Sequence, residues 1–197
     1  MPNNFIRPIR FRSQQGTSLL EVVLVMGFFV TILSVALPDL QQLHTRRQGS
    51  LALRKLANSI FVARSAAAES GNIAVLCPTP DGSSCGGKWQ QGILVFLDQN
   101  DNQHPDAGEE LVDHLQYEKL PGTLHWRAFR SKPYLQITPM GFTRYQNGNF
   151  TWCDLKKTPA SAHQLILNRT GRVRFAKDTN GDGLRENSSG GPIRCPS

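Results

Sequence analysis

The feature that most constrains this chain is an uncharged, apolar run near its N-terminus. From residue 22 to residue 37 the sequence contains no charged side chain. Counted from Thr17, the run is about 20 residues long, which at about 1.5 Å per residue of helix is enough to span the hydrocarbon core of a bilayer. We therefore expect one long apolar helix, with the rest of the chain built around it.

The residues around this run distinguish it from an ordinary secretory signal. Residues 1–16 contain three arginines and no acid, and they end at Gly16. A signal peptide needs a small-residue cleavage site after its apolar stretch, and Leu37-Pro38-Asp39 is a poor one. Glu21 is the one charge inside the run, and a lone carboxylate is costly in lipid, so it should have a partner or a function.

Gly16-Thr17-Ser18-Leu19-Leu20-Glu21, followed by an apolar helix, resembles the type IV prepilin signature. The resemblance implies that residues 1–16 are a leader peptide, that a prepilin peptidase cuts after Gly16, and that the new N-terminal residue, Thr17, is methylated. It also implies that Glu21 neutralises the terminal amine of a neighbouring subunit in a filament. Major pilins usually have phenylalanine at the position of Thr17, so the departure favours a minor subunit. The implied location is the bacterial inner membrane, with the headgroup in the periplasm, and then the pilus filament or its tip at the cell surface.

The helix is predicted to continue beyond Pro38, because proline kinks a helix without necessarily ending it. Leu53, Leu56 and Ile60 keep a spacing of three to four residues, and Ser70-Gly71 is a stop signal. We predict one helix over roughly residues 17–70. Residues 17–44 would be its transmembrane or filament-core part, and residues 45–197 would form a soluble headgroup.

From residue 73 the pattern changes to short β-type runs separated by turns. The expected strands are 73–76, 92–97, 110–117, 123–128, 135–137, 164–167 and 173–175. A long helix followed by antiparallel strands is an α+β arrangement, and with the prepilin start it implies the type IV pilin fold.

The four cysteines, Cys77, Cys85, Cys153 and Cys195, indicate disulfides in an exported chain. Three pairings are possible. Pairing neighbours in sequence, Cys77 with Cys85 and Cys153 with Cys195, is the simplest, and the other two stay open. A zinc site is the alternative, but the chain has no CxxC pair.

Charge is distributed unevenly along the chain. The formal net charge is +7, with 39% hydrophobic and 19% charged residues and a mean hydropathy of −0.33, which excludes a multi-span membrane protein and a disordered tail. Residues 119–177 hold eleven basic residues and a single acid, Asp154. Such an excess indicates a polyanionic partner.

Within that segment, Asn168-Arg169-Thr170-Gly171-Arg172-Val173-Arg174 is the strongest functional feature. If a turn at Thr170-Gly171 leads into a strand, Arg172 and Arg174 point to one face, and Arg169 can join them across the turn. Guanidinium groups suit phosphate because each offers a planar fork of donors. Further bases that would extend the patch are Lys177, Lys156, Lys157 and Arg144. The alternative is a hairpin whose charges are only solvated.

These features together resemble the FimT/GspH group of minor pilins and pseudopilins. The resemblance rests on the prepilin start, the Cys77–Cys85 loop, the stretch Trp89-Gln90-Gln91-Gly92-Ile93-Leu94-Val95-Phe96 with its acidic loop, and Gly-Arg-x-Arg at 171–174. FimT-like pilins with this C-terminal motif are implicated in natural transformation. The resemblance therefore implies non-specific binding of double-stranded DNA by Arg172 and Arg174, which Arg169 can join. It also implies other pilin subunits as partners. The alternative is a structural minor pilin or type II secretion pseudopilin that primes filament assembly.

Other motifs do not favour an enzyme, a cofactor or a metal. Gly82–Lys88 satisfies GxxxxGK, but Trp89 replaces the serine or threonine of a P-loop and no helix pattern follows. The acidic stretches 98–110 and 178–189 both contain oxygen ligands, and calcium binding stays open for both. In 178–189, Ser189 stands where a calcium loop needs a bidentate glutamate, so a solvated turn is preferred. In 98–110 a turn held by Asx side chains is preferred. The histidines, expected as scattered surface residues, are His44, His104, His114, His125 and His163.

Overall fold

The structure is a computed structural model that describes residue 16, residues 18–117 and residues 120–196, without the side chains of residues 35–42. The chain divides between Gln41 and Gln42 into two compact units, which are described separately below. The helix α1, Leu19–Ser70, contributes residues to both. Apart from Gly16, the predicted leader and Thr17 lie outside the described residues.

The first unit consists of the beginning of α1. Its described side chains are mostly apolar and exposed, Leu24, Phe28 and Val30 among them. Among the residues so described, no helix is both long enough and apolar enough to cross a membrane. The predicted span 17–44 also includes Thr17 and the side chains of residues 35–42, which are outside the description.

In the second unit, α1 supplies one side of the hydrophobic core. The face predicted from the spacing is buried: Leu53, Leu56 and Ile60 are at most 1% exposed, and Ala63 and Ala67 continue the same stripe. The helix ends at Ser70, where Gly71 takes a left-handed conformation, with φ of 72°, and its N–H donates to the Ala67 carbonyl. The predicted stop of the helix is confirmed.

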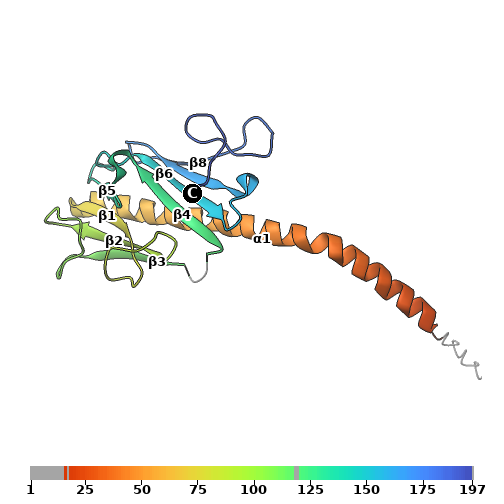
Figure 1. The fold of residues 1–197 in the computed structure, drawn as a ribbon. Helices are drawn as coiled ribbons and strands as arrows, with labels where there is room; N and C mark the ends of the chain where they lie inside the picture. Colours follow the sequence, from red (N-terminus) through yellow and green to blue (C-terminus); the bar gives the residue numbers. More distant parts are fainter. Residues whose placement is uncertain (1–15, 17, 118–119, 197) are drawn as a thin grey trace, which may run out of the picture. The chain divides into compact units, whose positions relative to one another are not determined.

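The described residues form two antiparallel four-stranded sheets, in the orders β3–β2–β1–β5 and β4–β6–β7–β8 (Figure 1). The first sheet contains β1 (Ile73–Pro78), β2 (Gly92–Asp98), β3 (Leu111–Gln116) and β5 (Leu135–Ile137). The second contains β4 (Gly122–Ala128), β6 (Gly148–Asp154), β7 (His163–Leu167) and β8 (Val173–Phe175). Two short 3-10 turns, η1 (Phe129–Ser131) and η2 (Pro159–Ser161), lie between strands. The α+β prediction is confirmed.

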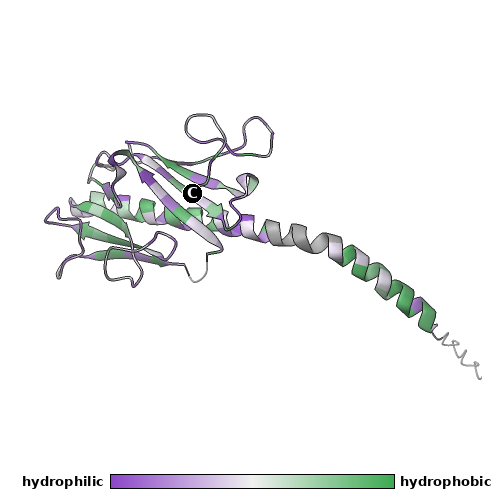
Figure 2. Cartoon of the chain, in the orientation of Figure 1, coloured by the Kyte–Doolittle hydropathy of each residue, from purple (hydrophilic) through white to green (hydrophobic). Residues whose placement is uncertain are grey.

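The strand β6 is the element that sequence patterning missed. Asn147-Gly148-Asn149 is a turn signal, and it conceals the alternation of Phe150 and Trp152 that follows. In the structure β6 pairs with both β4 and β7, and the side chains of Phe150 and Trp152 are fully buried. Apolar and polar residues occur together along the strands, as the green and purple segments of Figure 2 show.

Two disulfides fasten the loops of the second unit. Cys77 is bonded to Cys85, and Cys153 to Cys195, so the structure contains the pairing of sequence neighbours. The first bridge closes a loop after β1. The second joins β6 to the C-terminal tail across a sequence separation of 42 residues.

Candidate nucleic-acid interface

The Gly-Arg-x-Arg segment begins with the tight turn that the sequence predicts. The Gly171 N–H donates to the Asn168 carbonyl at 3.0 Å, and the Asn168 side-chain oxygen accepts from the Arg172 N–H at 2.9 Å and from the Thr170 hydroxyl at 2.8 Å. Gly171 has φ of 72°, a conformation that glycine adopts without steric cost. The turn leads directly into β8.

Arg172 and Arg174 extend to the outer face of the second sheet. Arg174 lies opposite Ile166 of β7, and Arg172 follows the same alternation, whereas Val173 packs against the core on the other face. Both arginines are exposed, and neither forms an ion pair among the described residues. Two positive charges therefore face solvent on one side of an edge strand.

The turn is braced from the helix and from a neighbouring loop. The Arg64 guanidinium, from α1, donates to the Gly171 carbonyl at 3.0 Å. The Thr143 N–H donates to the Arg169 carbonyl at 2.9 Å. The Gly141 carbonyl lies so near Gly171 that a Cβ there would be 2.1 Å from its oxygen. The turn that carries the arginines is thus held both by the helix α1 and by the loop that contains Gly141 and Thr143.

Arg169 is exposed and points along the turn toward Tyr145. Its guanidinium carbon lies 5.2 Å from the centre of the Tyr145 ring, and that of Arg130 lies 5.8 Å from the same ring. Arg130 and Tyr145 were not among the predicted site residues. The high density of basic residues over 119–177 was the one sequence signal that could have pointed to Arg130. Nothing in the sequence shows that the loops of Arg130 and Tyr145 lie together.

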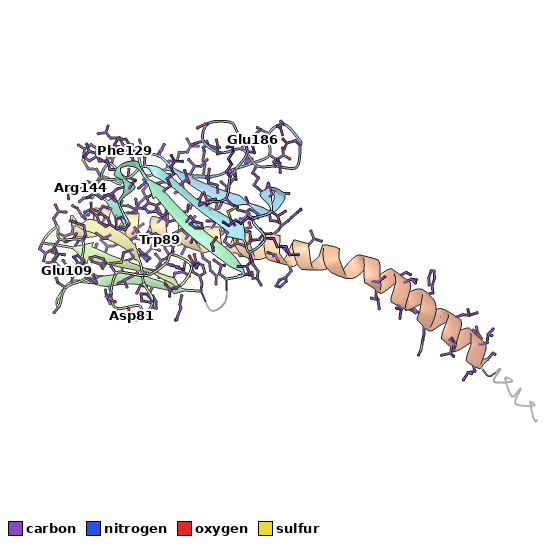
Figure 3. All side chains as sticks on the ribbon, viewed as in Figure 1. Asp81, Trp89, Glu109, Phe129, Arg144 and Glu186 are labelled. Carbon is purple, nitrogen blue, oxygen red and sulfur yellow. A yellow bond between two sulfur atoms is a disulfide. The ribbon has the colours of Figure 1, made fainter. Side chains whose placement is uncertain are left out.

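Arg144, proposed as part of the patch, is neutralised in the structure. It forms an ion pair with Asp101, and the hydrogen bond from Arg144 holds the pKa of the Asp101 carboxyl below its ordinary value. Arg144 is therefore not a free cation for phosphate. Figure 3 shows it at the same end of the second unit as Phe129.

The three lysines proposed as extensions do not gather around Arg172. Lys156 and Lys157 follow the end of β6, whereas Arg172 lies beyond its beginning, where Gly148 pairs with Leu167. Seven strand residues at about 3.4 Å each separate the two ends by roughly 20 Å. Lys177 is exposed two residues after the end of β8, away from the 168–171 turn.

The register adds one basic residue to the same face. Arg127 of β4 pairs with Asn149, Asn149 pairs with Ile166, and Ile166 pairs with Arg174. Arg127 is exposed and shares the outer face with Arg174, three strands away, at about 4.8 Å per strand. Sequence reasoning missed it because its role depends on β6, which was not predicted.

The acidic loops are held by their own backbone. Asp178 accepts from the Gly181 and Gly183 N–H groups, and Glu186 accepts from the Thr179 N–H and hydroxyl. Oxygens of Asp178, Asp182 and Glu186 lie within 4.8 Å of one another. In the other loop Asp98 accepts from the Asn102 and Gln103 N–H groups. Side-chain oxygens thus cap the backbone in both loops, and calcium binding stays open for both.

His163 departs from the expected surface position. It is partly buried in β7, its ring centre lies 5.8 Å from that of Trp152, and burial, aided by the charges of Arg185 and Arg46, lowers its pKa to about 4. His125 is also partly buried, and burial and the charge of Lys157 lower its pKa. Both histidines lie in strands of the second sheet, His125 in β4 and His163 in β7, so the prediction of surface positions is wrong for these two.

The fold and its surface define a class of protein. A long N-terminal helix packed on antiparallel sheets is the type IV pilin fold. A family model described as "Type II transport protein GspH" matches residues 52–171, and the chain belongs to this family. Its members are structural proteins and not enzymes, so the chain is a minor pilin or pseudopilin of a type IV pilus or a type II secretion system.

Individual proteins resemble the chain in sequence or in fold. The chain is 34% identical over 98 residues to the pilin-like protein PilA1 of Thermus thermophilus, and the match covers 50% of this chain and 57% of that protein. A crystal structure of the type IV minor pilin FimU of Pseudomonas aeruginosa superposes with a TM-score of 0.51 at 18% identity, over 77% of this chain and 97% of FimU. The minor pseudopilin EpsH of the Vibrio cholerae type 2 secretion system gives a TM-score of 0.48 at 10% identity, over 65% of this chain and 95% of EpsH.

Proposed function

We propose that this minor pilin binds extracellular double-stranded DNA without sequence preference, for DNA uptake in natural transformation. Arg172 and Arg174 are the principal phosphate contacts, with Arg169 beside them. The observation that supports the proposal most is the pair of exposed arginines on a braced turn, with no carboxylate partner among the described residues. A subunit that needed these residues only for solubility would not require a fixed turn beneath them.

The proposed binding is electrostatic and weak for one subunit. Phosphate contacts carry no base information, so affinity should not depend on sequence. A single subunit is expected to have a Kd of about micromolar or weaker at physiological salt. Several subunits in one filament raise the affinity for long DNA by avidity.

The test is a titration of the full-length chain in a mild non-ionic detergent with two unrelated blunt duplexes. The Arg172→Ala/Arg174→Ala double variant should bind both duplexes about tenfold more weakly, and each lost phosphate contact should flatten the salt slope by about 1. The matched control is Lys55→Ala/Lys88→Ala, which removes two exposed positive charges elsewhere in the second unit. If the two double variants bind equally well, the arginines have no particular role in DNA binding.

The competing function is that of a structural minor pilin or type II secretion pseudopilin that primes filament assembly, with which membership of the GspH family is equally compatible. In that case the outer face of β8 docks another subunit. The same double variant distinguishes the two functions, because it would then reduce the number of filaments and leave DNA binding unchanged.

A further inference from the structure

A second surface, next to the arginine turn, alternates aromatic rings with guanidinium groups. The Arg130 guanidinium carbon lies 5.8 Å from the ring centres of both Phe129 and Tyr145, and Arg169 lies over the Tyr145 ring at 5.2 Å. The rings are open to solvent, with Phe129 57% and Tyr145 54% exposed. We call Phe129, Arg130, Tyr145 and Arg169 the Tyr145 platform.

The backbone fixes the platform in place. Arg130 has φ of 65° and Tyr145 φ of 63°, a left-handed conformation that costs a side chain of their size about 1 kcal/mol or more. Hydrogen bonds hold both loops: the Phe129 N–H donates to the Asn147 carbonyl at 2.8 Å, and the Tyr145 N–H to the Thr143 carbonyl at 2.9 Å. A strained backbone conformation persists only where the surrounding structure holds it in place. The surrounding loops therefore hold the exposed rings in fixed positions.

The cations of this surface are not paired with acids. Asp101 forms its ion pair with Arg144, outside the platform. Lys132, Arg130 and Arg169 have aromatic rings as their neighbours, and no carboxylate pairs with them in the described part of the chain. A partner with both a flat apolar face for the rings and negative charge for the cations would therefore fit this surface.

A hollow of about 750 Å³ opens beside the platform. It is lined by residues of the loop between Thr138 and Tyr145 and by Arg169 and Thr170. Two of the lining side chains are apolar and exposed, Met140 at 81% and Phe142 at 40%. Binding sites for small organic molecules have volumes of about 300–1,000 Å³, so the hollow has room for a nucleobase. Tyr145 and Arg169 belong to both the platform and the hollow.

We propose that the Tyr145 platform stacks unpaired bases of DNA, so that the protein binds single strands or frayed ends through contacts that an intact duplex cannot make. Aromatic rings and guanidinium planes are the groups on which bases stack in single-stranded nucleic acid sites, and every base offers a π-face. In a duplex those faces are already stacked on their neighbours. This inference rests on the proposed function, because the phosphates of the same strand would be held by the adjoining Arg172 and Arg174.

The experiment compares three probes of equal length on the full-length chain in detergent: a mixed-sequence single strand, the same strand with abasic sites throughout, and a blunt duplex. The abasic strand keeps the phosphates and removes the bases. We expect wild type to bind the intact single strand about tenfold more tightly than the abasic strand. Tyr145→Ala should abolish that difference and change duplex binding less than twofold, while Tyr145→Phe should retain it.

Two further variants separate stacking from misfolding. Tyr145→Asn removes the ring but tolerates the left-handed backbone, and it should behave as Tyr145→Ala does. Phe61→Ala is the matched control, because Phe61 is 66% exposed in α1 and lies outside the platform. It should leave all three affinities unchanged.

The outcomes are distinct for the two proposals. Equal binding of intact and abasic strands by wild type overturns the platform, whether or not duplex binding through Arg172 and Arg174 survives. Tyr145-dependent binding of single strands without duplex binding supports the platform and contradicts the proposed function. If Tyr145→Ala binds every DNA as wild type does but reduces filament number, the surface docks another pilin subunit and the platform is wrong.

Discussion

Gly171 has two independent reasons to be glycine. Its φ of 72° is unfavourable for other residues, and a Cβ would lie 2.1 Å from the Gly141 carbonyl oxygen. We expect Gly171→Ala to destabilise the protein more than Gly181→Ala, by about 1–3 kcal/mol, as measured by urea unfolding. Gly181 is the control because it has φ of 80° but no atom within 4 Å of its added Cβ. Equal losses would mean that backbone conformation alone matters at Gly171.

His163 makes the stability of the second unit depend on pH. Its pKa of about 4 in the folded state lies below the ordinary value of 6.5, because burial and the charges of Arg185 and Arg46 oppose protonation. The unfolded state therefore binds the proton first, and stability falls as pH decreases from about 6.5 through about 4. We expect wild type to lose about 2 kcal/mol between pH 7 and pH 4.5 that His163→Gln does not lose. Urea unfolding at the two pH values measures the difference, and parallel losses in both proteins would exclude His163 as the cause.

At the scale of elements, the contact between α1 and β6 depends on Gly49. A Cβ on Gly49 would lie 2.2 Å from the Trp152 ring, so the ring packs directly on the helix backbone. Gly49-Ser50 inside a helix would ordinarily weaken it, by about 1 kcal/mol for the glycine relative to alanine. Here the packing of Trp152 offsets that loss.

This contact reverses the usual effect of a helical Gly→Ala substitution. We expect Gly49→Ala to destabilise by about 1–3 kcal/mol, because overpacking the ring outweighs the gain in helix propensity. In a Trp152→Leu background, where the ring is absent, the same substitution should be neutral or stabilising. Thermal unfolding of the four proteins in this double-mutant cycle gives the coupling, and additive effects would show that Gly49 and Trp152 do not interact.

At the scale of the whole molecule, the elements that depend on local pattern were predictable. The stripe of Leu53, Leu56 and Ile60 follows helical spacing, and the strands other than β6 follow β-type runs bounded by turns. The turn at 168–171 followed from Thr170-Gly171 in the same way. The residues adjacent in the chain are enough to predict each of these features.

The features that were missed depend on contacts between distant residues. Arg64 braces Gly171 across 107 positions, and no local signal announces that hydrogen bond. Tyr145 stacks with Arg130 and Arg169 only because three separate loops meet. The neutralisation of Arg144 by Asp101 likewise joins two segments 43 positions apart, and counting bases along the sequence could not reveal it.

We expect incorporation into a filament to depend on the first residues of the chain. We expect Gly16→Val to leave the protein at full length in the membrane fraction, since the prepilin resemblance assigns cleavage after Gly16. Glu21→Ala should be cleaved normally but should assemble poorly, because a neighbouring terminal amine then has no carboxylate. Immunoblots of the membrane and of sheared filaments measure both steps. A mature chain beginning at Thr17 in the Gly16→Val variant would contradict the assignment.

The bond between Cys153 and Cys195 also governs how the protein responds to a protease outside the cell. The exposed loop around Gly181 and Gly190 lies between the two cysteines, so a single cut there divides the chain without releasing either piece. The severed tail stays attached to β6, and β8 with its arginines remains on the larger fragment. A nicked subunit would thus migrate as an intact one on a gel until a reducing agent is added. It would also keep the arginine surface of β8 and its C-terminal tail, whereas the same cut in a chain without this disulfide would release the tail.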